Sequence, residues 1–206
     1  MRSADNMFLQ KENTLTEKIV KALEDVSANP AGKSKWTKND FFYDIKKSAT
    51  TTKGAFGEEV FQHLLQSPEA KSLGFVDCEL IDEGRGDFDH LVLHKTYGPI
   101  RVECKLATLD TNEGFQFNGI RKNREYDFVY CLGVSPWSMH HGVLAKSFCQ
   151  ELTTLMEKNN RDGFKWSAKP KNLELFRDFK SELGGNNDLS FLRGFLKLIQ
   201  EIKKGS

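Results

Sequence analysis

The chain has 206 residues, of which 38% are hydrophobic and 29% are charged, and its net charge is +1. This length and composition are typical of one soluble globular domain that is large enough to bury a core. A charge so close to neutral gives no overall basic field of the kind expected of a chain devoted entirely to nucleic acid. The sequence has no internal repeat, no P-loop, no glycine-rich dinucleotide turn and no Ser-His-Asp pattern.

Cysteine usage and hydropathy predict the compartment. The four cysteines have no CxxC spacing, and at least Cys104 and Cys131 lie within apolar runs, which predicts reduced core thiols and not a structural zinc site. The chain contains no secretory apolar region and no apolar run long enough to span a bilayer. We therefore expect a cytoplasmic protein with no membrane partner.

Two features mark residues 1–53. Thr14 and Glu17 have capping-box spacing in front of an apolar helical stripe, which predicts a packing helix. Residues 31–53 then carry six lysines against two aspartates, a local charge of about +4, with aromatic residues between the lysines. Basic residues between aromatics can follow a phosphate backbone, which makes Lys35 a candidate DNA contact. The alternative is a solvated loop and a short amphipathic helix whose aromatics belong to the core.

The next segments predict a helix and a strand. Residues 54–65 have apolar side chains at helical spacing, with Glu58 and Glu59 in the first turns, where either can be a partner of the helix dipole. Residues 74–81 form the first predicted strand, which leads into the acidic loop 82–86. Two glycines flank Arg85 in this loop, so the segment either permits close backbone approach to DNA or is a flexible connector.

A hairpin follows, with apolar strands at residues 91–93 and 100–106 and turn chemistry at residues 96–99. A turn centred near Tyr97 would place Asp89 opposite Lys105, within about a residue either way. Strand alternation puts Asp87 and Asp89 on one face of their strand, and Glu103 and Lys105 on one face of theirs.

This gathering of charge predicts a site. Buried charges cost several kcal/mol each unless they are paired or bound to metal, so the face that carries them must be open or functional. Two carboxylates from neighbouring strands suit a hard divalent cation, of which Mg²⁺ is the commonest. Such an ion lowers the pKa of a bound water, and a nearby lysine can position that water or stabilise developing charge. The alternative is an exposed, salt-bridged hairpin edge.

Residues 108–136 contain a polar loop, a basic segment and a strongly apolar strand at residues 128–132. Gln116, Arg121, Lys122 and Arg124 cluster before that strand. The arginines and the lysine are candidate phosphate contacts, and the alternative for Arg121 is a salt bridge to Asp127 or Glu125.

Residues 137–206 are less specific. His140 and His141 are expected in a solvated loop, residues 144–156 in a helix, residues 165–167 in a short strand and residues 189–202 in a further helix.

The order of the hairpin residues resembles a known signature. An aspartate, an apolar strand and then Glu-x-Lys on the next strand are typical of the PD-(D/E)XK nuclease superfamily, and the likeness covers residues 54–136. Asp89, Glu103 and Lys105 match the motif residue by residue. The proline of the family's name is absent, because Gly86 precedes Asp87. The resemblance favours Asp89 as the motif aspartate, since it directly abuts the apolar strand, and leaves Asp87 as an alternative or supporting ligand.

The resemblance also assigns roles to neighbouring elements. Residues 54–65 resemble the family's first core helix, in which small residues let the helix lie close to the sheet and a glutamate leans toward the metal. Glu58 follows Gly57 as in the family's Gly-Glu pair, with Glu59 as the alternative. Gln116 stands where many relatives have a glutamine that points into the site, and Arg121 would be a phosphate contact.

The resemblance thus implies an α/β restriction-endonuclease-like core, with a central mixed β-sheet flanked by helices and with helical N- and C-terminal elaborations. Residues 1–206 would form one nuclease domain, made of an N-terminal helical and basic segment (1–53), a catalytic core (54–136) and a C-terminal elaboration (137–206). Asp89, Glu103 and Glu58 would hold the metal.

The implied function is that of a Mg²⁺-dependent DNA endonuclease, for which Mn²⁺ can substitute, most like a Type II restriction endonuclease. Its expected partners are double-stranded DNA and a second copy of the chain. The alternatives are a junction resolvase or DNA-repair nuclease of the same fold, or a non-catalytic nucleic-acid-binding module.

Overall fold

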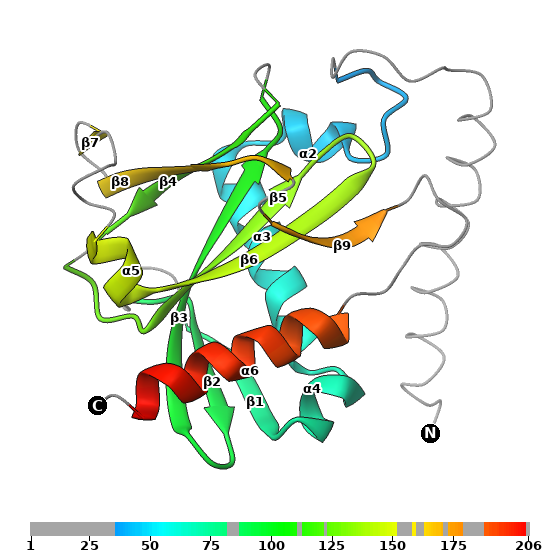
Figure 1. The fold of residues 1–206 in the computed structure, drawn as a ribbon. Coiled ribbons are helices and arrows are strands. Elements are labelled where there is room, and N and C mark those ends of the chain that lie inside the picture. The colour runs from blue at the N-terminus through cyan, green and yellow to red at the C-terminus, as the bar shows by residue number, and fades with distance from the viewer. Residues whose placement is uncertain are drawn as a thin grey trace.

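A computed structural model describes residues 36–81, 87–110, 113–121, 123–151, 158–159, 163–170, 173–178 and 188–204 (Figure 1). It confirms an α/β architecture with a mixed central sheet flanked by helices. The expected N-terminal helix lies outside the described residues. Within them, no helix is both long enough and apolar enough to cross a membrane.

The central sheet has six strands in the order β1-β2-β3-β5-β6-β9. Their bounds are β1 Phe75–Leu80, β2 His90–His94, β3 Gly98–Thr108, β5 Phe128–Val134, β6 Ser138–Ala145 and β9 Glu174–Asp178. β3 and β5 are parallel, and the other neighbouring pairs are antiparallel. The predicted strands at residues 74–81, 91–93, 100–106 and 128–132 are therefore confirmed.

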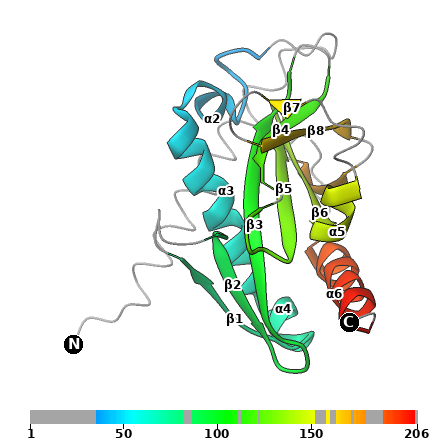
Figure 2. The same cartoon turned by 90° about the vertical axis from the view of Figure 1, so that its left-hand side faces the viewer.

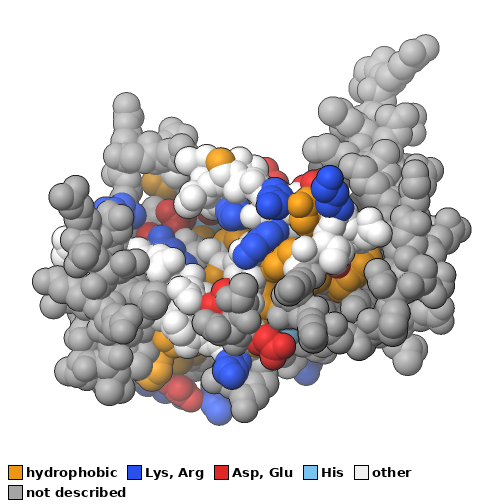
Figure 3. All heavy atoms as spheres, turned by 90° about the horizontal axis from the view of Figure 1, so that it is seen from above, with side chains coloured by type: hydrophobic (Ala, Val, Ile, Leu, Met, Phe, Trp, Pro, Cys, Tyr) orange, Lys and Arg blue, Asp and Glu red, His pale blue; other side chains and the backbone are white. Residues whose placement is uncertain are grey.

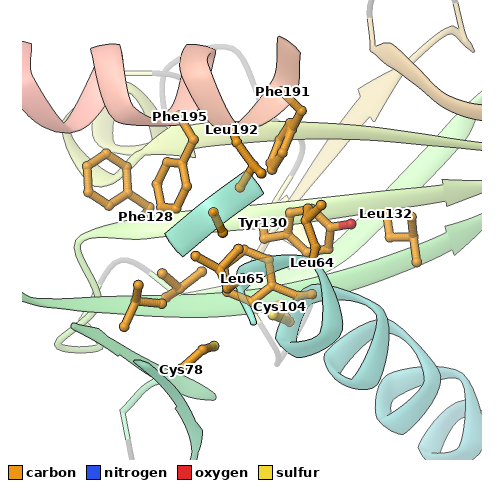
Figure 4. Close-up of a cluster of buried hydrophobic side chains, with 14 of the residues drawn as sticks. Leu64, Leu65, Cys78, Cys104, Phe128, Tyr130, Leu132, Phe191, Leu192 and Phe195 are labelled. Atoms are coloured by element: carbon orange, nitrogen blue, oxygen red, sulfur yellow. The ribbon is translucent and has the colours of Figure 1, made fainter. Parts of the chain in front are cut away.

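Every residue of β5 is buried, because both faces of this part of the sheet are covered. On one face, Phe128, Tyr130 and Leu132 pack with side chains of α3 (Thr50–Leu65) and α6 (Asp188–Lys204) (Figure 4). Val129 and Cys131 alternate to the other face and join a second core cluster. All four cysteines are free and buried, as the sequence predicts.

A small second sheet contributes to that other cluster. It has the order β4-β8-β7, with bounds β4 Phe115–Ile120, β8 Gly163–Ala168 and β7 Lys158–Asn159. Figure 2 shows α3 on one side of β3 and β5 and α5 (Lys146–Glu151) on the other. The helix expected at residues 144–156 begins only at Lys146, because residues 144 and 145 still belong to β6. Two short helices, α2 (Tyr43–Lys47) and α4 (Pro68–Ser72), complete the described elements.

The turn between β2 and β3 lies one residue earlier than the sequence predicts. His94 pairs with Gly98, whose φ of 68° is the left-handed conformation that glycine adopts without strain, so the turn centres on Thr96. Moving the centre of a hairpin by one residue shifts its partners by two. Leu91 therefore pairs with Arg101.

The expectation of a solvated loop at residues 140–141 is wrong, because both histidines lie in β6. His141 is fully buried, and its ring stacks on Phe191 of α6 with 3.8 Å between the centroids. Burial, with a smaller contribution from His140, lowers the pKa of His141 to about 3. The ring is therefore neutral at physiological pH and serves as core beneath α6.

The contact between the two sheets gives a stability prediction. A Cβ on Gly133 would lie 2.7 Å from the Phe115 ring, closer than real atoms approach, so the ring or the strand would have to move. We expect Gly133→Ala to lower the free energy of unfolding by about 1–3 kcal/mol, the usual effect of overpacking.

The matched control is Gly194→Ala in α6, where an added Cβ meets nothing within 4 Å. Alanine is the better helix former by about 1 kcal/mol, so this variant should be neutral or more stable. Urea unfolding of both variants measures the difference. Equal stability of the two would show that Phe115 does not pack on Gly133 as described.

Candidate active site

The β2–β3 hairpin brings Asp89 beside the strand that carries Glu103. The regular pairing of β2 begins with His90 opposite Val102, and Asp89, directly before it, donates its N–H to the Val102 carbonyl at 3.0 Å. A residue opposite Glu103 in a regular ladder would not bond the Val102 carbonyl, so the ladder is irregular at Asp89. The Asp89 carboxylate is fixed by the Cys104 N–H, which donates to Oδ2 at 2.6 Å.

Glu103 is the least exposed carboxylate of this group, with a side chain only 2% exposed. Lys105 Nζ donates to Oε1 at 2.5 Å, and the Arg124 guanidinium donates to Oε2 at 3.4 Å. The side chains of Lys105 and Arg124 are 21% and 27% exposed, so they form the solvent-accessible side of the cluster. A buried carboxylate is tolerated only when it is paired in this way.

The loop that carries Arg124 is anchored independently of the guanidinium. The Lys146 ammonium, at the start of α5, donates a hydrogen bond to the Arg124 carbonyl. It also lies 5.3 Å from the centre of the Tyr126 ring. Burial, followed by the charges of Cys149 and Glu103, raises the pKa of Tyr126. Its hydroxyl is buried and has no hydrogen-bond partner among the described residues. The backbone around Arg124 is thus held by α5 while its side chain reaches Glu103.

Helix α3 brings Glu58 toward the sheet. A Cβ on Gly57 would lie 3.3 Å from Leu106 Cβ, so the helix lies close against β3 at this glycine. Glu58 and Phe61 share the sheet-facing side of the helix, on which Glu58 is half-buried, whereas Glu59 is exposed. Of the two candidate glutamates, only Glu58 points toward the core.

The Cys104 thiol lies within the electrostatic reach of the candidate residues. Burial raises its pKa well above the usual range, the charges of Asp89 and Glu58 raise it further, and Lys105 lowers it. Cys104 belongs to the α3 side of the sheet, however, and alternation puts Glu103 and Lys105 on the opposite side. Glu103 and Lys105 therefore share the face opposite to the Cys104 thiol, on which the charges of both Asp89 and Glu58 act.

The donor chemistry of this cluster fits a hard cation, but a complete coordination sphere is not assembled. Asp89 and Glu103 offer carboxylate oxygens from adjacent strands, as Mg²⁺ prefers. Both oxygens of Glu103 are occupied by cations. In the part of the chain that the structure describes, no group of three or more His, Cys, Asp or Glu residues is arranged to hold a metal ion. A divalent cation would compete with these side-chain cations for Glu103.

Gln116 lies outside this cluster. It is exposed in β4, and its amide donates to Asp110 Oδ2 at 2.8 Å. Its neighbours Phe115 and Phe117 are both fully buried, so alternation turns Gln116 away from the core between the sheets. The prediction that this side chain points into the site stays a prediction, and the contact that the structure gives it is with Asp110.

The structure gives the candidate DNA contacts different surroundings. Arg124 binds Glu103, while Arg121 is half-buried. Arg101 lies 3.2 Å from Glu125 and 3.0 Å from Asp127, the two acids proposed as partners of Arg121. Lys35, Arg85 and Lys122 lie outside the described residues. The pairing of Arg124 with Glu103 was missed from sequence, because 21 positions separate the two residues and no local pattern links them.

The lysine-rich segment packs on the far end of β3. Lys46 of α2 donates to the Leu109 carbonyl at 3.1 Å and lies 5.6 Å from the centre of the Trp36 ring. Burial, followed by the charge of Lys53, lowers the pKa of Lys46, so these lysines are close enough to repel. Figure 3 shows Lys and Arg side chains gathered near the middle of the upper face, beside hydrophobic ones.

Lys46, Lys47 and Lys53 together are called the α2–α3 basic patch below, because the charges of Lys47 and Lys53 both act on Lys46. The aromatics of this segment divide as the alternative interpretation predicts. Phe42 is core, and Trp36 and Phe41 pack against it.

Comparison with known proteins adds no assignment: neither a protein family nor a curated protein matches this chain. What the residues can do therefore rests on their geometry and on the motif they resemble.

The Asp89 hydrogen bond gives a prediction that separates structure from chemistry. Asp89→Ala would leave the buried Cys104 N–H without its acceptor, so we expect a loss of about 1–3 kcal/mol in the free energy of unfolding. Asp89→Asn keeps an oxygen acceptor at the same position and should lose less. Chemical unfolding of the two variants measures this difference, and an alanine variant as stable as the asparagine variant would contradict it.

Proposed function

We propose that this protein hydrolyses phosphodiester bonds in DNA with the help of a divalent cation, on a restriction-endonuclease-like core. The observation that carries the proposal is the buried Glu103 paired with Lys105 on one face of β3, with the Asp89 carboxylate held by the N–H of Cys104 between them in the chain. This is the arrangement that the Asp and Glu-x-Lys motif of PD-(D/E)XK nucleases would need. A Type II restriction endonuclease, acting as a homodimer with one site for each DNA strand, is the specific form that we propose.

The burial of Glu103 favours a functional site over a salt-bridged hairpin edge. An edge pair would be solvent-exposed, where ion pairs contribute about 0–1 kcal/mol. Glu103 is instead buried on a central strand, where a well-packed apolar residue would often be as stable or more so. A carboxylate kept at such a position, with a lysine two residues away, is best explained by chemistry that needs both.

Asp89 and Glu103 would hold Mg²⁺ or Mn²⁺, and Glu58 would be a further ligand if its side chain reaches around the hairpin. The ion supplies a bound water of lowered pKa and polarises a phosphoryl oxygen. The chain's own residues do the rest. The Cys104 N–H keeps the Asp89 carboxylate oriented. The Lys105 ammonium, already at Glu103, would donate to the attacking water or to the charged phosphoryl oxygens.

Double-stranded DNA is the proposed substrate, and the α2–α3 basic patch supports it. Lys47 is exposed and Lys53 is partly exposed, and both lie close enough to Lys46 to lower its pKa. Such a concentration of charge in a chain of net charge +1 would attract a phosphate backbone to this face.

The decisive experiment is DNA cleavage with a matched pair of helix variants. We expect the wild type with Mg²⁺ to cut plasmid or phage DNA, and Glu103→Gln and Lys105→Met to lower kcat at least about 100-fold, as expected when groups that stabilise developing charge are removed. Glu58→Gln should also impair cleavage. Glu59→Gln, the same change at the exposed neighbouring position, should not.

Several outcomes would contradict the proposal. Cleavage by Glu103→Gln or Lys105→Met at the wild-type rate would remove the assignment at these positions. A wild type that binds DNA but cuts neither linear, supercoiled nor branched DNA with Mg²⁺ or Mn²⁺ would point to a non-catalytic binding module. Discrete fragments would identify a sequence-specific enzyme, and cleavage of branched DNA alone would identify a resolvase.

A further inference from the structure

The contact between Arg124 and Glu103 has a consequence beyond cleavage itself. Arg124 donates to Glu103 Oε2 at 3.4 Å, while Lys105 holds Oε1 at 2.5 Å. Glu103 is almost fully buried beneath these two cations. A divalent cation would compete with them for this carboxylate, and the longer contact of Arg124 is the weaker of the two.

We infer that Arg124 is a positioning residue that covers Glu103 in the metal-free protein and moves to a DNA phosphate when a divalent cation takes Glu103. This inference rests on the proposed function, because it requires that Glu103 binds a metal ion. It links metal binding to substrate binding through one side chain.

The anchoring of the loop makes this movement possible. Lys146 holds the carbonyl of Arg124 and not its guanidinium, so the side chain can leave Glu103 while the backbone stays in place. The Arg124 side chain is already 27% exposed, on the solvent side of the cluster. A guanidinium fork suits phosphate oxygens as well as it suits a carboxylate, and its charge persists at every pH used for catalysis.

Competition for one carboxylate has a definite thermodynamic sign. In the free protein, Arg124 opposes metal binding, because it competes with the ion for Glu103. Once the ion is bound, the released guanidinium is available to DNA, so metal and DNA each raise the affinity for the other by the same factor. If Arg124 only stabilised the site, its removal would instead weaken metal binding.

The test is Mn²⁺ binding to the DNA-free protein near pH 8, followed by the paramagnetic resonance signal of free Mn²⁺. We expect Arg124→Gln to bind Mn²⁺ at least about fivefold more tightly than the wild type, the lower end of common coupling factors. Arg124→Lys keeps a positive charge on the same loop and should fall between them. Arg193→Gln removes equal charge from an exposed position of α6, and its Mn²⁺ affinity should stay close to that of the wild type.

A second measurement tests the phosphate half of the inference. With Ca²⁺ in place of Mg²⁺ to prevent cleavage, the factor by which the cation raises affinity for a DNA duplex should be smaller in Arg124→Gln than in the wild type. An unchanged factor would overturn this half. Circular dichroism of each variant confirms that it is folded, and if Arg124→Gln does not fold, Arg124→Lys carries the same comparison with a smaller expected gain.

The failures of the inference and of the proposed function are distinguishable. A wild type that binds no Mn²⁺ at this site removes the proposed metal site, and the inference with it. A wild type that binds Mn²⁺, together with an Arg124→Gln variant whose affinity is equal or weaker, overturns the role of Arg124 alone and leaves the proposed nuclease intact.

Discussion

The rest of the candidate site depends on the burial of one carboxylate, that of Glu103, in the middle of β3. Because an unpaired buried charge would cost several kcal/mol, the structure must bring cations to it. Lys105 comes from the same strand, whereas Arg124 comes from the loop before β5. Lys146 in turn fixes that loop to α5. The charge on one strand therefore explains how a loop and a helix beyond it are placed.

Close packing of α3 determines which acidic residue can join this site. Gly57 lets the helix approach Leu106 on β3, and the helical period then turns Glu58 toward the sheet and Glu59 to solvent. Glu58 acts on the Cys104 thiol from the opposite face to Glu103. The same physical principle, alternation along β3, thus gathers Glu103 and Lys105 on one face and sets them apart from Glu58.

The sequence predicts what depends on local periodicity and fails where distant segments meet. Apolar runs and alternation give the strands, the α3 helix and the shared face of Glu103 and Lys105. The hairpin register is off by two residues, because Gly98 begins β3 at positive φ and moves the turn. The Gln116 side chain is exposed, as alternation along β4 dictates, whereas the resemblance predicted that it points into the site. Arg124 could not be assigned to Glu103, since only the packing of the β4–β5 loop brings them together.

The central claim is that Asp89 and Glu103 together form a divalent-cation site. Anomalous diffraction from a crystal soaked in Mn²⁺ tests it most directly, because the ion's own signal locates it. The account predicts an anomalous peak within about 2.0–2.6 Å of a carboxylate oxygen of both residues, the range for hard cations with oxygen ligands, with Arg124 moved off Glu103. A crystal in which Glu103 keeps both Lys105 and Arg124, with no peak between it and Asp89, would contradict the claim.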